Sequence, residues 1–536
     1  MCNSARLKEN KPQNQRQTTF KKFALDLLWF VIVQIHVLLD LVIDFCFKLY
    51  YQNKIQKVPP IKNDLLQDSA VTLAKKIRNK QVSAEEVVQV FVKRCKEVNG
   101  MLNIIVEECY DQAIQEAKKV DKFLKDHEDP ASLEKSKPFL GVPFTTKDGN
   151  RAKGLLHTVG SVHRKDYRSE EDATVIGYLK AAGGILLGST NVPEMNLWTE
   201  SRNNVYGQTN NPYETTRTVG GSSGGDAAAV ASCAVPMTVS SDIGGSIRMP
   251  AFFNGVFGYK PSQGITSIKG VGMRENDFEN SMAAVGPICK KAEDLAPLLK
   301  VLAGNKVHKL KLDEPVNLKT LNIFYQEESG DIRTSKINGE LREALRKVVA
   351  HFQNITGSAT KVKLPGTESS FRLWRYWMTK EEGEFRYNLT NRQYRTSAKA
   401  EIINLFTFRS QVTAAAILKL IDEDYFPKEN SQWAEETTEN LKKQLLMKLG
   451  DNGVLFYPSS PFPAGYHYSA YLRPYNFGYW CIFNVLNLPT CQVPLGLDKN
   501  GLPIGIQVVA APYQDHLCLA VAKELESAFG GWVNPS

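Results

Sequence analysis

The sequence predicts an α/β protein with one large core, preceded by a membrane helix. Three observations support this prediction. The 536 residues are 43% hydrophobic and 23% charged, which is typical of a globular protein with a sizeable core. From about residue 65, short apolar stretches of strand character alternate with amphipathic helical stretches, the order that builds α/β folds. Before this part, residues 25–49 form a long apolar run.

Charge and cysteine usage exclude several classes of protein. The net charge of +9 fits weak attraction to an anionic membrane surface. No basic cluster of the folded part is interleaved with aromatic residues, so a nucleic-acid partner is not expected. The nine cysteines are scattered and form neither a C-x-x-C pair nor a Cys/His quartet. We therefore expect buried thiols rather than disulfides or a zinc site.

The N-terminal residues predict a tail and an uncleaved membrane anchor. Residues 1–22 are polar and basic, which favours disorder. As a helix, residues 25–49 would be about 37 Å long, enough to cross a bilayer. Polar residues on one side of that helix leave a choice between spanning the membrane, which we prefer, and lying in its interface. These residues are Asp26, Gln34, His36, Asp40, Asp44 and Lys48.

The flanks of this helix bear on its orientation. The apolar run is too long for a cleaved signal peptide, and no small-residue cleavage site precedes Tyr50. If the helix spans, its basic N-terminus favours a cytoplasmic start and places the rest of the chain on the far side. Sequons at Asn354 and Asn388 permit that orientation, but their use is left open. Residues 50–64, with two consecutive prolines, are expected to be a linker.

Residues 65–536 are expected to form the folded domain. Ser83 and Glu86 are spaced as a capping box, which predicts a helix that continues to about Lys96. Residues 305–450 are richer in charge and are predicted to be a variable helical insertion, with aromatic clusters at 371–377 and 406–408. The remaining patterns predict strands at 104–106, 144–147, 185–188, 454–458, 490–496 and 505–510, and helices at 111–124, at 173–182 and ending near 304.

Residues 219–250 contain two serine clusters flanked by glycines, Ser222-Ser223 and Ser246. Glycine lets the backbone turn tightly and approach a ligand closely. Hydrolysis of an amide by serine needs a base for the hydroxyl, donors for the oxyanion and an acid for the leaving amine. None of the eight histidines lies in a G-x-S-x-G motif, so the base must be another residue.

Lys147 is the candidate base because it ends the apolar stretch G-V-P-F-T-T-K. A buried lysine can be neutral near pH 7, since burial disfavours its charged form. Two alternatives stay open at this point. Lys147 could be salt-bridged to the adjacent Asp148, and the glycine cluster could be a phosphate-binding turn, although it lacks the G-x-x-x-x-G-K-[ST] pattern.

Together these motifs resemble the amidase signature family over residues 65–524. The resemblance implies one α/β/α domain with a central mixed, twisted sheet, and a reaction without metal or cofactor. The matching blocks are G-V-P-F-T-T-K-D (141–148), D-A-T-V-I-G-Y-L-K-A-A-G-G-I-L-L-G-S-T-N (172–191), Y-G-Q-T-N-N-P-Y (206–213), G-G-S-S-G-G (220–225), S-D-I-G-G-S-I-R-M-P-A (241–251), G-Y-K-P-S (258–262) and G-L-P-I-G-I-Q-V-V (501–509).

By position, the resemblance implies a Ser-Ser-Lys triad. Ser246 would be the nucleophile, Ser222 the bridging serine on a cis peptide, and Lys147 the base. Asp242 and Arg248 would hold the loop of the nucleophile. The oxyanion hole would consist of the backbone N–H groups of Ile243, Gly244, Gly245 and Ser246.

Within the family, residues 244–262, 292–304, 502–510, 515–523 and 529–533 are most similar to fatty-acid amide hydrolases of the second, shorter type. This implies a lipid amide substrate and a membrane-bound enzyme, and we expect an endomembrane location, endoplasmic reticulum or lipid droplet. The aromatic clusters would then line an acyl channel or form ordinary core. The alternatives are a glutaminase-type subunit of a tRNA-dependent amidotransferase and a catalytically silent lipid-binding or scaffolding protein. The preferred acyl chain and amine, and whether the protein is a homodimer, are left open.

Overall fold

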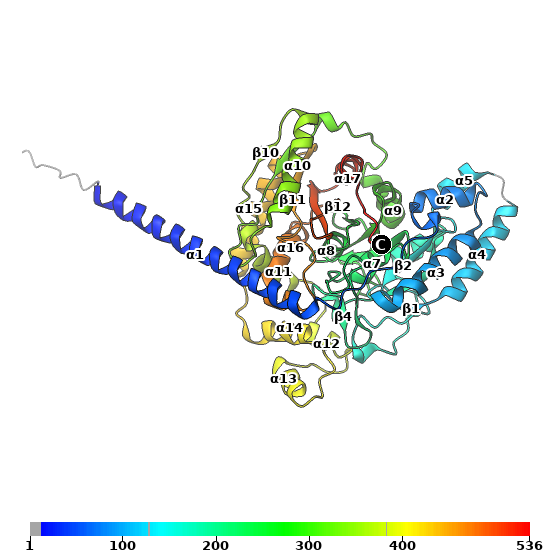
Figure 1. Ribbon diagram of the computed structural model, residues 1–536, viewed down its shortest axis with the longest axis horizontal. Coiled ribbons are helices and arrows are strands. Elements are labelled where there is room, and N and C mark those ends of the chain that lie inside the picture. Colours follow the sequence, from blue (N-terminus) through cyan, green and yellow to red (C-terminus); the bar gives the residue numbers. More distant parts are fainter. Residues whose placement is uncertain (1–11, 127–128, 382) are drawn as a thin grey trace, which may run out of the picture.

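The computed structural model describes residues 12–126, 129–381 and 383–536 (Figure 1). A large mixed sheet runs through the body, as the resemblance implies. The strands β2, β3 and β6 are parallel, as are β9, β10 and β11, and the other pairs are antiparallel. In spatial order the eleven strands are β1 (Ile105–Glu108), β3 (Ile185–Thr190), β2 (Pro143–Lys147), β6 (Met237–Asp242), β8 (Ala284–Cys289), β7 (Phe257–Lys260), β12 (Thr490–Leu497), β13 (Pro503–Ala510), β11 (Gly453–Pro458), β9 (Asn322–Tyr325) and β10 (Thr360–Lys361).

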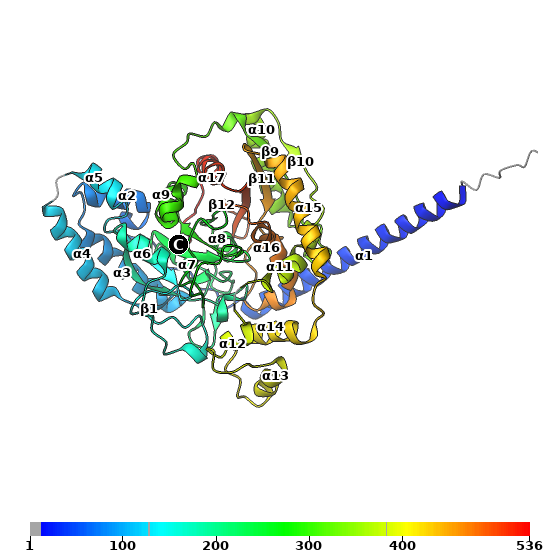
Figure 2. The ribbon, with the colours of Figure 1, turned by 180° about the vertical axis from the view of Figure 1, so that it is seen from behind.

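Helices surround this sheet, seen from the opposite side in Figure 2. The helices α3, α4 and α7 pack against strands of the first half of the sheet, and α8, α10 and α17 pack against β12 and its neighbours. A small hairpin, β4 (Arg202–Asn203) and β5 (Gly207–Gln208), stands apart. The helices of the body are α2 (Ala70–Arg78), α3 (Ala84–Leu102), α4 (Tyr110–Lys125), α5 (Pro130–Ser136), α6 (Thr174–Ala181), α7 (Gly224–Ala231), α8 (Arg248–Phe253), α9 (Leu295–Ala303), α10 (Gly339–Thr356), α11 (Ser370–Met378), α12 (Phe385–Asn388), α13 (Ala398–Phe406), α14 (Ala414–Tyr425), α15 (Ser431–Leu449), α16 (Gly478–Val485) and α17 (Asp515–Phe529).

Local sequence patterns predicted several of these features correctly. The capping box is confirmed, because the Ser83 hydroxyl accepts a hydrogen bond from Glu86 N–H at the start of α3. The helix ends at Leu102 rather than near Lys96. The next residue, Asn103, adopts a left-handed conformation with a φ of 52° and ends the helix. Buried thiols are confirmed at Cys95, Cys233, Cys289, Cys481, Cys491 and Cys518.

The segment 305–450 is mostly helical, as predicted, but it also contributes to the sheet. Its strands β9 and β10 extend the sheet beyond β11. Three central strands, β6, β7 and β8, were also not predicted. Every residue of these strands is buried, so none of them shows the alternation that marks a strand with one solvated face.

The N-terminal helix α1 (Pro12–Tyr51) projects from the body as an arm (Figures 1 and 2). It contains the predicted helix at 25–49, and it shows that residues 12–22 are helical rather than disordered. The rest of the predicted tail, residues 1–11, lies outside the described residues. Among the residues that are described, no helix combines the length and the apolar character needed to cross a membrane. The predicted membrane-spanning helix is therefore not found.

The polar side of α1 contacts the body of the protein. Arg473 of the body donates to Asp40 Oδ1 at 2.6 Å and to Asp44 Oδ1 at 2.9 Å, so the polar stripe contacts the protein. On the same helix, Leu38 and Phe45 are each 62% exposed. The helix is thus fixed to the body by its acidic residues and presents apolar side chains outward.

Candidate active site

The site lies where two neighbouring parallel strands end. The strand β2 ends at Lys147 and β6 ends at Asp242, with Thr146 opposite Val239 in the register. Because parallel strands bring their carboxyl ends to the same edge of a sheet, residues just beyond them converge there. The loop that leads into α7 places Ser222 at this edge.

Lys147 contacts serines and not the adjacent carboxylate. Its Nζ donates to Ser222 Oγ at 2.7 Å and to Ser223 Oγ at 3.2 Å, and all three residues are buried. Successive residues of a strand point to opposite faces, so Asp148 points away. It accepts hydrogen bonds from the backbone N–H groups of Thr158 and Gly160. The alternative of a Lys147–Asp148 ion pair is therefore wrong.

The environment of Lys147 suits a base. Burial lowers the pKa of its ammonium group from 10.5 to about 8, although the carboxylates of Asp226 and Asp242 act to raise it. Asp226 does not touch the ammonium group; it accepts hydrogen bonds from the Thr190 and Ser240 hydroxyls instead. A substantial neutral fraction of Lys147 is therefore present near pH 8.

The backbone around Ser222 has the form that the resemblance implies. The Gly221–Ser222 peptide bond is cis. A Cβ on Gly221 would lie 2.2 Å from the Trp198 carbonyl oxygen, so only glycine fits beneath this turn. The turn leads directly into α7, where Ser223 is the residue before the helix.

Ser246 and Ser222 line one cavity of about 830 Å³, together with Ser241, Asp242 and Ile243. The described residues show no hydrogen bond between Ser222 Oγ and Ser246 Oγ. Bonds of this kind are often long before substrate binds. The structure thus places Ser222 and Ser246 in one cavity, and it joins Lys147 directly to Ser222.

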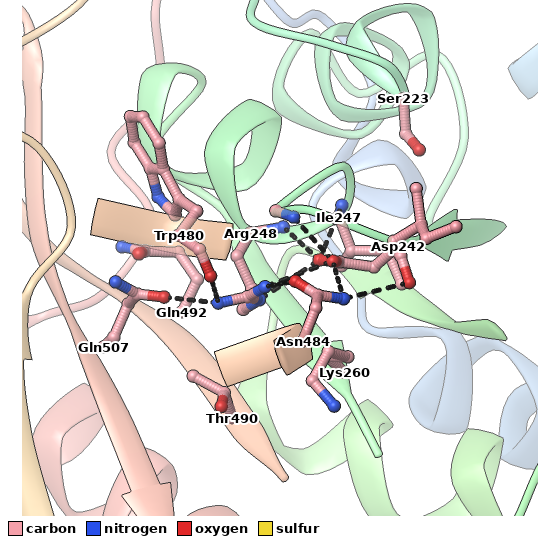
Figure 3. Close-up of polar contacts among 12 residues, drawn as sticks. Ser223, Asp242, Ile247, Arg248, Lys260, Trp480, Asn484, Thr490, Gln492 and Gln507 are labelled. Carbon is pink, nitrogen blue, oxygen red and sulfur yellow. Dashed lines mark hydrogen bonds and ion pairs between the residues drawn. The ribbon is translucent and has the colours of Figure 1, made fainter. Parts of the chain in front are cut away.

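A buried ion pair holds the loop of Ser246 (Figure 3). Arg248 donates from Nε to Asp242 Oδ2 and from Nη2 to Asp242 Oδ1, each at 3.1 Å. It also donates to Asn484 Oδ1, Gln507 Oε1 and the Trp480 carbonyl. Burial acts to raise the pKa of Asp242, but the Arg248 guanidinium holds it well below the usual range. The predicted supporting roles of Asp242 and Arg248 are confirmed by these contacts.

The loop has backbone N–H groups that could donate hydrogen bonds to a substrate, and one of them already donates to another residue. Gly245 N–H donates to Asp242 Oδ1 at 2.7 Å, so it would have to give up this bond to bind an oxyanion. The N–H groups of Ile243, Gly244 and Ser246 have no acceptor among the described residues. The four-donor oxyanion hole stays a prediction, with these three groups unoccupied.

The ion pair leads to a prediction about stability. The variant Arg248→Ala is expected to lower the free energy of unfolding by about 3–5 kcal/mol, because it leaves the buried Asp242 carboxylate without its cation. Equilibrium urea denaturation measures this change. The control is Arg168→Ala, which breaks an ion pair whose arginine is 57% exposed and should change stability little. Equal effects of the two variants would contradict the prediction.

The aromatic clusters do not form one acyl channel. Tyr376 and Met378 line the cavity, whereas Phe406 and Phe408 lie outside its lining and are 77% and 97% exposed. The channel is therefore not built from the 406–408 cluster. The cavity is also lined by charged side chains, including Arg375, which is ion-paired with Asp422 on α14 and with Glu429.

Two residues contact this loop in a way that could not be predicted from their local sequence. Asn484 bridges the Asp242 carboxylate and the Met282 carbonyl, yet it lies in an apolar stretch far along the chain. Trp374 donates from Nε1 to the Ile243 carbonyl at 2.9 Å, and it comes from the segment where the resemblance is thinnest. Only tertiary packing brings these residues to the loop.

Comparisons with known proteins agree with this geometry. The family model described as Amidase matches residues 86–519. Fatty-acid amide hydrolase 2 of Homo sapiens is 43% identical over 487 residues, covering 89% of this chain and 92% of that protein. One component of the glutamyl-tRNA(Gln) amidotransferase of Prochlorococcus marinus is 30% identical over 478 residues, covering 84% and 95%. A solved structure of a fatty acid amide hydrolase shares the fold with a TM-score of 0.70 at 21% identity, covering 88% of this chain and 86% of that chain.

Proposed function

The chain belongs to the amidase family, and on this premise we propose that it hydrolyses fatty-acid amides through an acyl-enzyme on Ser246. One observation carries the proposal. A fully buried lysine donates to Ser222 at 2.7 Å, beside a cavity that Ser222 shares with Ser246. Such a contact has a clear chemical use, because a desolvated lysine that can lose its proton can activate a hydroxyl.

The reaction follows from these positions. Neutral Lys147 accepts the Ser222 proton while Ser222 accepts the Ser246 proton, and Ser246 Oγ bonds to the amide carbonyl carbon. The tetrahedral intermediate is stabilised by backbone N–H groups of the loop. The proton returns through Ser222 to the amine nitrogen, the C–N bond breaks and the amine leaves. Water then cleaves the ester by the same proton relay and releases the fatty acid.

The cavity supports a lipid amide as substrate. A volume of about 830 Å³ suits a long acyl chain, although charged and apolar side chains both line the cavity. The relative with 43% identity is named a fatty-acid amide hydrolase. The apolar residues of the lining include Val159, Met195, Leu197, Ile243, Val271, Met273, Ala283 and Met378.

The two alternatives from the sequence fit these observations less well. Glutamine is small, and a cavity of about 830 Å³ is much larger than this substrate needs. A catalytically silent protein would have no need of the intact contact between Lys147 and Ser222. We retain both alternatives as outcomes of the assay described next.

Turnover by the purified full-length protein tests the proposal. Oleamide and anandamide are expected to be hydrolysed, and free glutamine is not. Release of ammonia from glutamine without turnover of either lipid amide would favour the glutaminase. Absence of turnover with all three substrates, and of labelling by a serine-directed probe, would favour the silent protein.

We further propose that the enzyme attaches to a membrane interface through α1. The acidic side of this helix is paired with Arg473, and the apolar side chains of Leu38, Leu41 and Phe45 are each more than 60% exposed. A helix of this kind buries its apolar face at the boundary between headgroups and acyl chains. Attachment would bring the cavity to the phase that dissolves long-chain amides. An endomembrane location and a homodimer stay predictions.

Membrane binding by α1 can be measured with vesicles. The double variant Leu38→Gln/Phe45→Gln is expected to lower partitioning onto phosphatidylcholine vesicles by roughly tenfold per residue, since each side chain loses its apolar burial. The control is Met447→Gln, another apolar residue with 70% exposure that lies on α15. Co-sedimentation gives the partition coefficients. If the double variant and the control bind equally, α1 is not the membrane-binding element.

A further inference from the structure

The loop of the nucleophile is held from two sides. On one side, the Asp242 carboxylate accepts hydrogen bonds from Gly245 N–H at 2.7 Å and from Ile247 N–H at 3.1 Å. These bonds fix the second half of the loop. The peptide unit between Ile243 and Gly244 is not reached by this carboxylate, so its orientation must have another cause.

Trp374 supplies that contact from α11. Its Nε1 donates to the Ile243 carbonyl oxygen at 2.9 Å. Phe477 packs edge-on against the indole, with ring centroids 4.7 Å apart, and limits its movement. A Cβ on Gly244 would lie 2.6 Å from the Phe477 ring and 2.9 Å from Trp374 Nε1. The two aromatic side chains therefore press directly on the backbone of the loop, which explains why Gly244 is a glycine.

The geometry of the peptide unit links the orientation of the Ile243 carbonyl to the direction of the Gly244 N–H. The peptide bond between Ile243 and Gly244 is trans, and a planar trans peptide points its C=O and its N–H in opposite directions. When Trp374 binds the Ile243 carbonyl, the Gly244 N–H is directed away from the indole. That N–H is one of the three that have no acceptor among the described residues, and Ile243 and Ser246 on either side line the cavity.

We propose that Trp374 is a positioning residue of the reaction, which directs the Gly244 N–H toward the oxyanion by holding the preceding carbonyl. The inference rests on the proposed amide hydrolysis by Ser246. In this role, Trp374 does not need to contact the substrate. A donor fixed before the charge develops needs no reorganisation in the transition state, so the contribution of Trp374 should appear in kcat rather than in KM.

The variant Trp374→Phe tests this inference, because it keeps an aromatic ring and removes the donor. We expect kcat for oleamide to fall by roughly tenfold or more with KM nearly unchanged, a smaller loss than the 10²–10³ typical of deleting an oxyanion donor itself. The affinity for an oleoyl trifluoromethyl ketone, whose adduct with Ser246 carries an oxyanion, should fall by the same factor. Incorporation of 3-benzothienylalanine at position 374 replaces the N–H by sulfur at constant shape and should reproduce both losses.

Trp377→Phe is the matched control. Trp377 lies on the same helix and donates from Nε1 to Thr438 Oγ1 at 2.9 Å, away from the loop. Its kcat and ketone affinity should equal those of the wild type, and a purely structural role for Trp374 would give the two variants the same profile. A raised KM with unchanged kcat and ketone affinity would overturn the inference and make Trp374 a wall of the acyl site. Absence of amide turnover by the wild type would instead refute the proposed function, and the inference with it.

Discussion

Replacing Ser246 by alanine is expected to abolish amide hydrolysis, with kcat lower by roughly 10⁴-fold or more. No acyl-enzyme can form without this hydroxyl, and the loss should leave binding of lipid amides nearly intact. Turnover of oleamide measures the effect. The matched control is Ser223→Ala, because Ser223 also lies within 3.2 Å of Lys147 but is hydrogen-bonded to the Ser241 carbonyl.

Ser223→Ala should lower activity by no more than roughly thirtyfold, since its hydroxyl makes two supporting hydrogen bonds, each worth about 1 kcal/mol. If Ser223→Ala abolished turnover and Ser246→Ala did not, the roles assigned to the two serines would be wrong.

Replacing Lys147 by alanine should lower kcat by on the order of 10²–10⁴-fold, the range of a lost general base. The same residue should set the pH dependence. Burial lowers its pKa to about 8, and only the neutral form accepts a proton. Wild-type kcat/KM for oleamide, which does not ionise in this range, is therefore expected to rise with pH and to level off above about pH 8.

Lys260 provides the control for this assignment. It is a second buried lysine near the loop (Figure 3), and burial lowers its pKa to about 7, but its Nζ donates only to the Pro261 carbonyl among the described residues. Lys260→Met should keep the rise near pH 8. If that variant removed the rise, the titrating base would be Lys260 and not Lys147.

The triad could be predicted from sequence because its residues lie in short motifs next to strands. Lys147 ends an apolar stretch, and glycines surround both serines, so local pattern and family resemblance agree. The residues that hold the loop differ in this respect. Trp374 and Asn484 reach it from helices that follow more than 100 residues later, and nothing in their local sequence indicates what they will contact.

The fold could be predicted from the sequence to a similar extent. Where a capping signal or a clear apolar pattern was present, as at the start of α3 and in β13, the elements were placed to within a few residues. The strand β6 was missed because its Thr238, Ser240 and Ser241 are polar, although the sheet buries them all. The spanning helix was predicted for α1 from its long apolar run. Only the structure shows that Arg473 of the body is the partner of Asp40 and Asp44 on its polar side.

The central claim is that Ser246 is the nucleophile that Lys147 activates through Ser222. The most direct test is to treat the full-length protein with a fluorophosphonate probe and to locate the modified residue by peptide mass spectrometry. We expect a single phosphonylated site, Ser246, with labelling lost in Ser246→Ala and greatly slowed in Lys147→Ala. Modification of Ser223 or Ser222 in the wild type, with Ser246 unmodified, would contradict it.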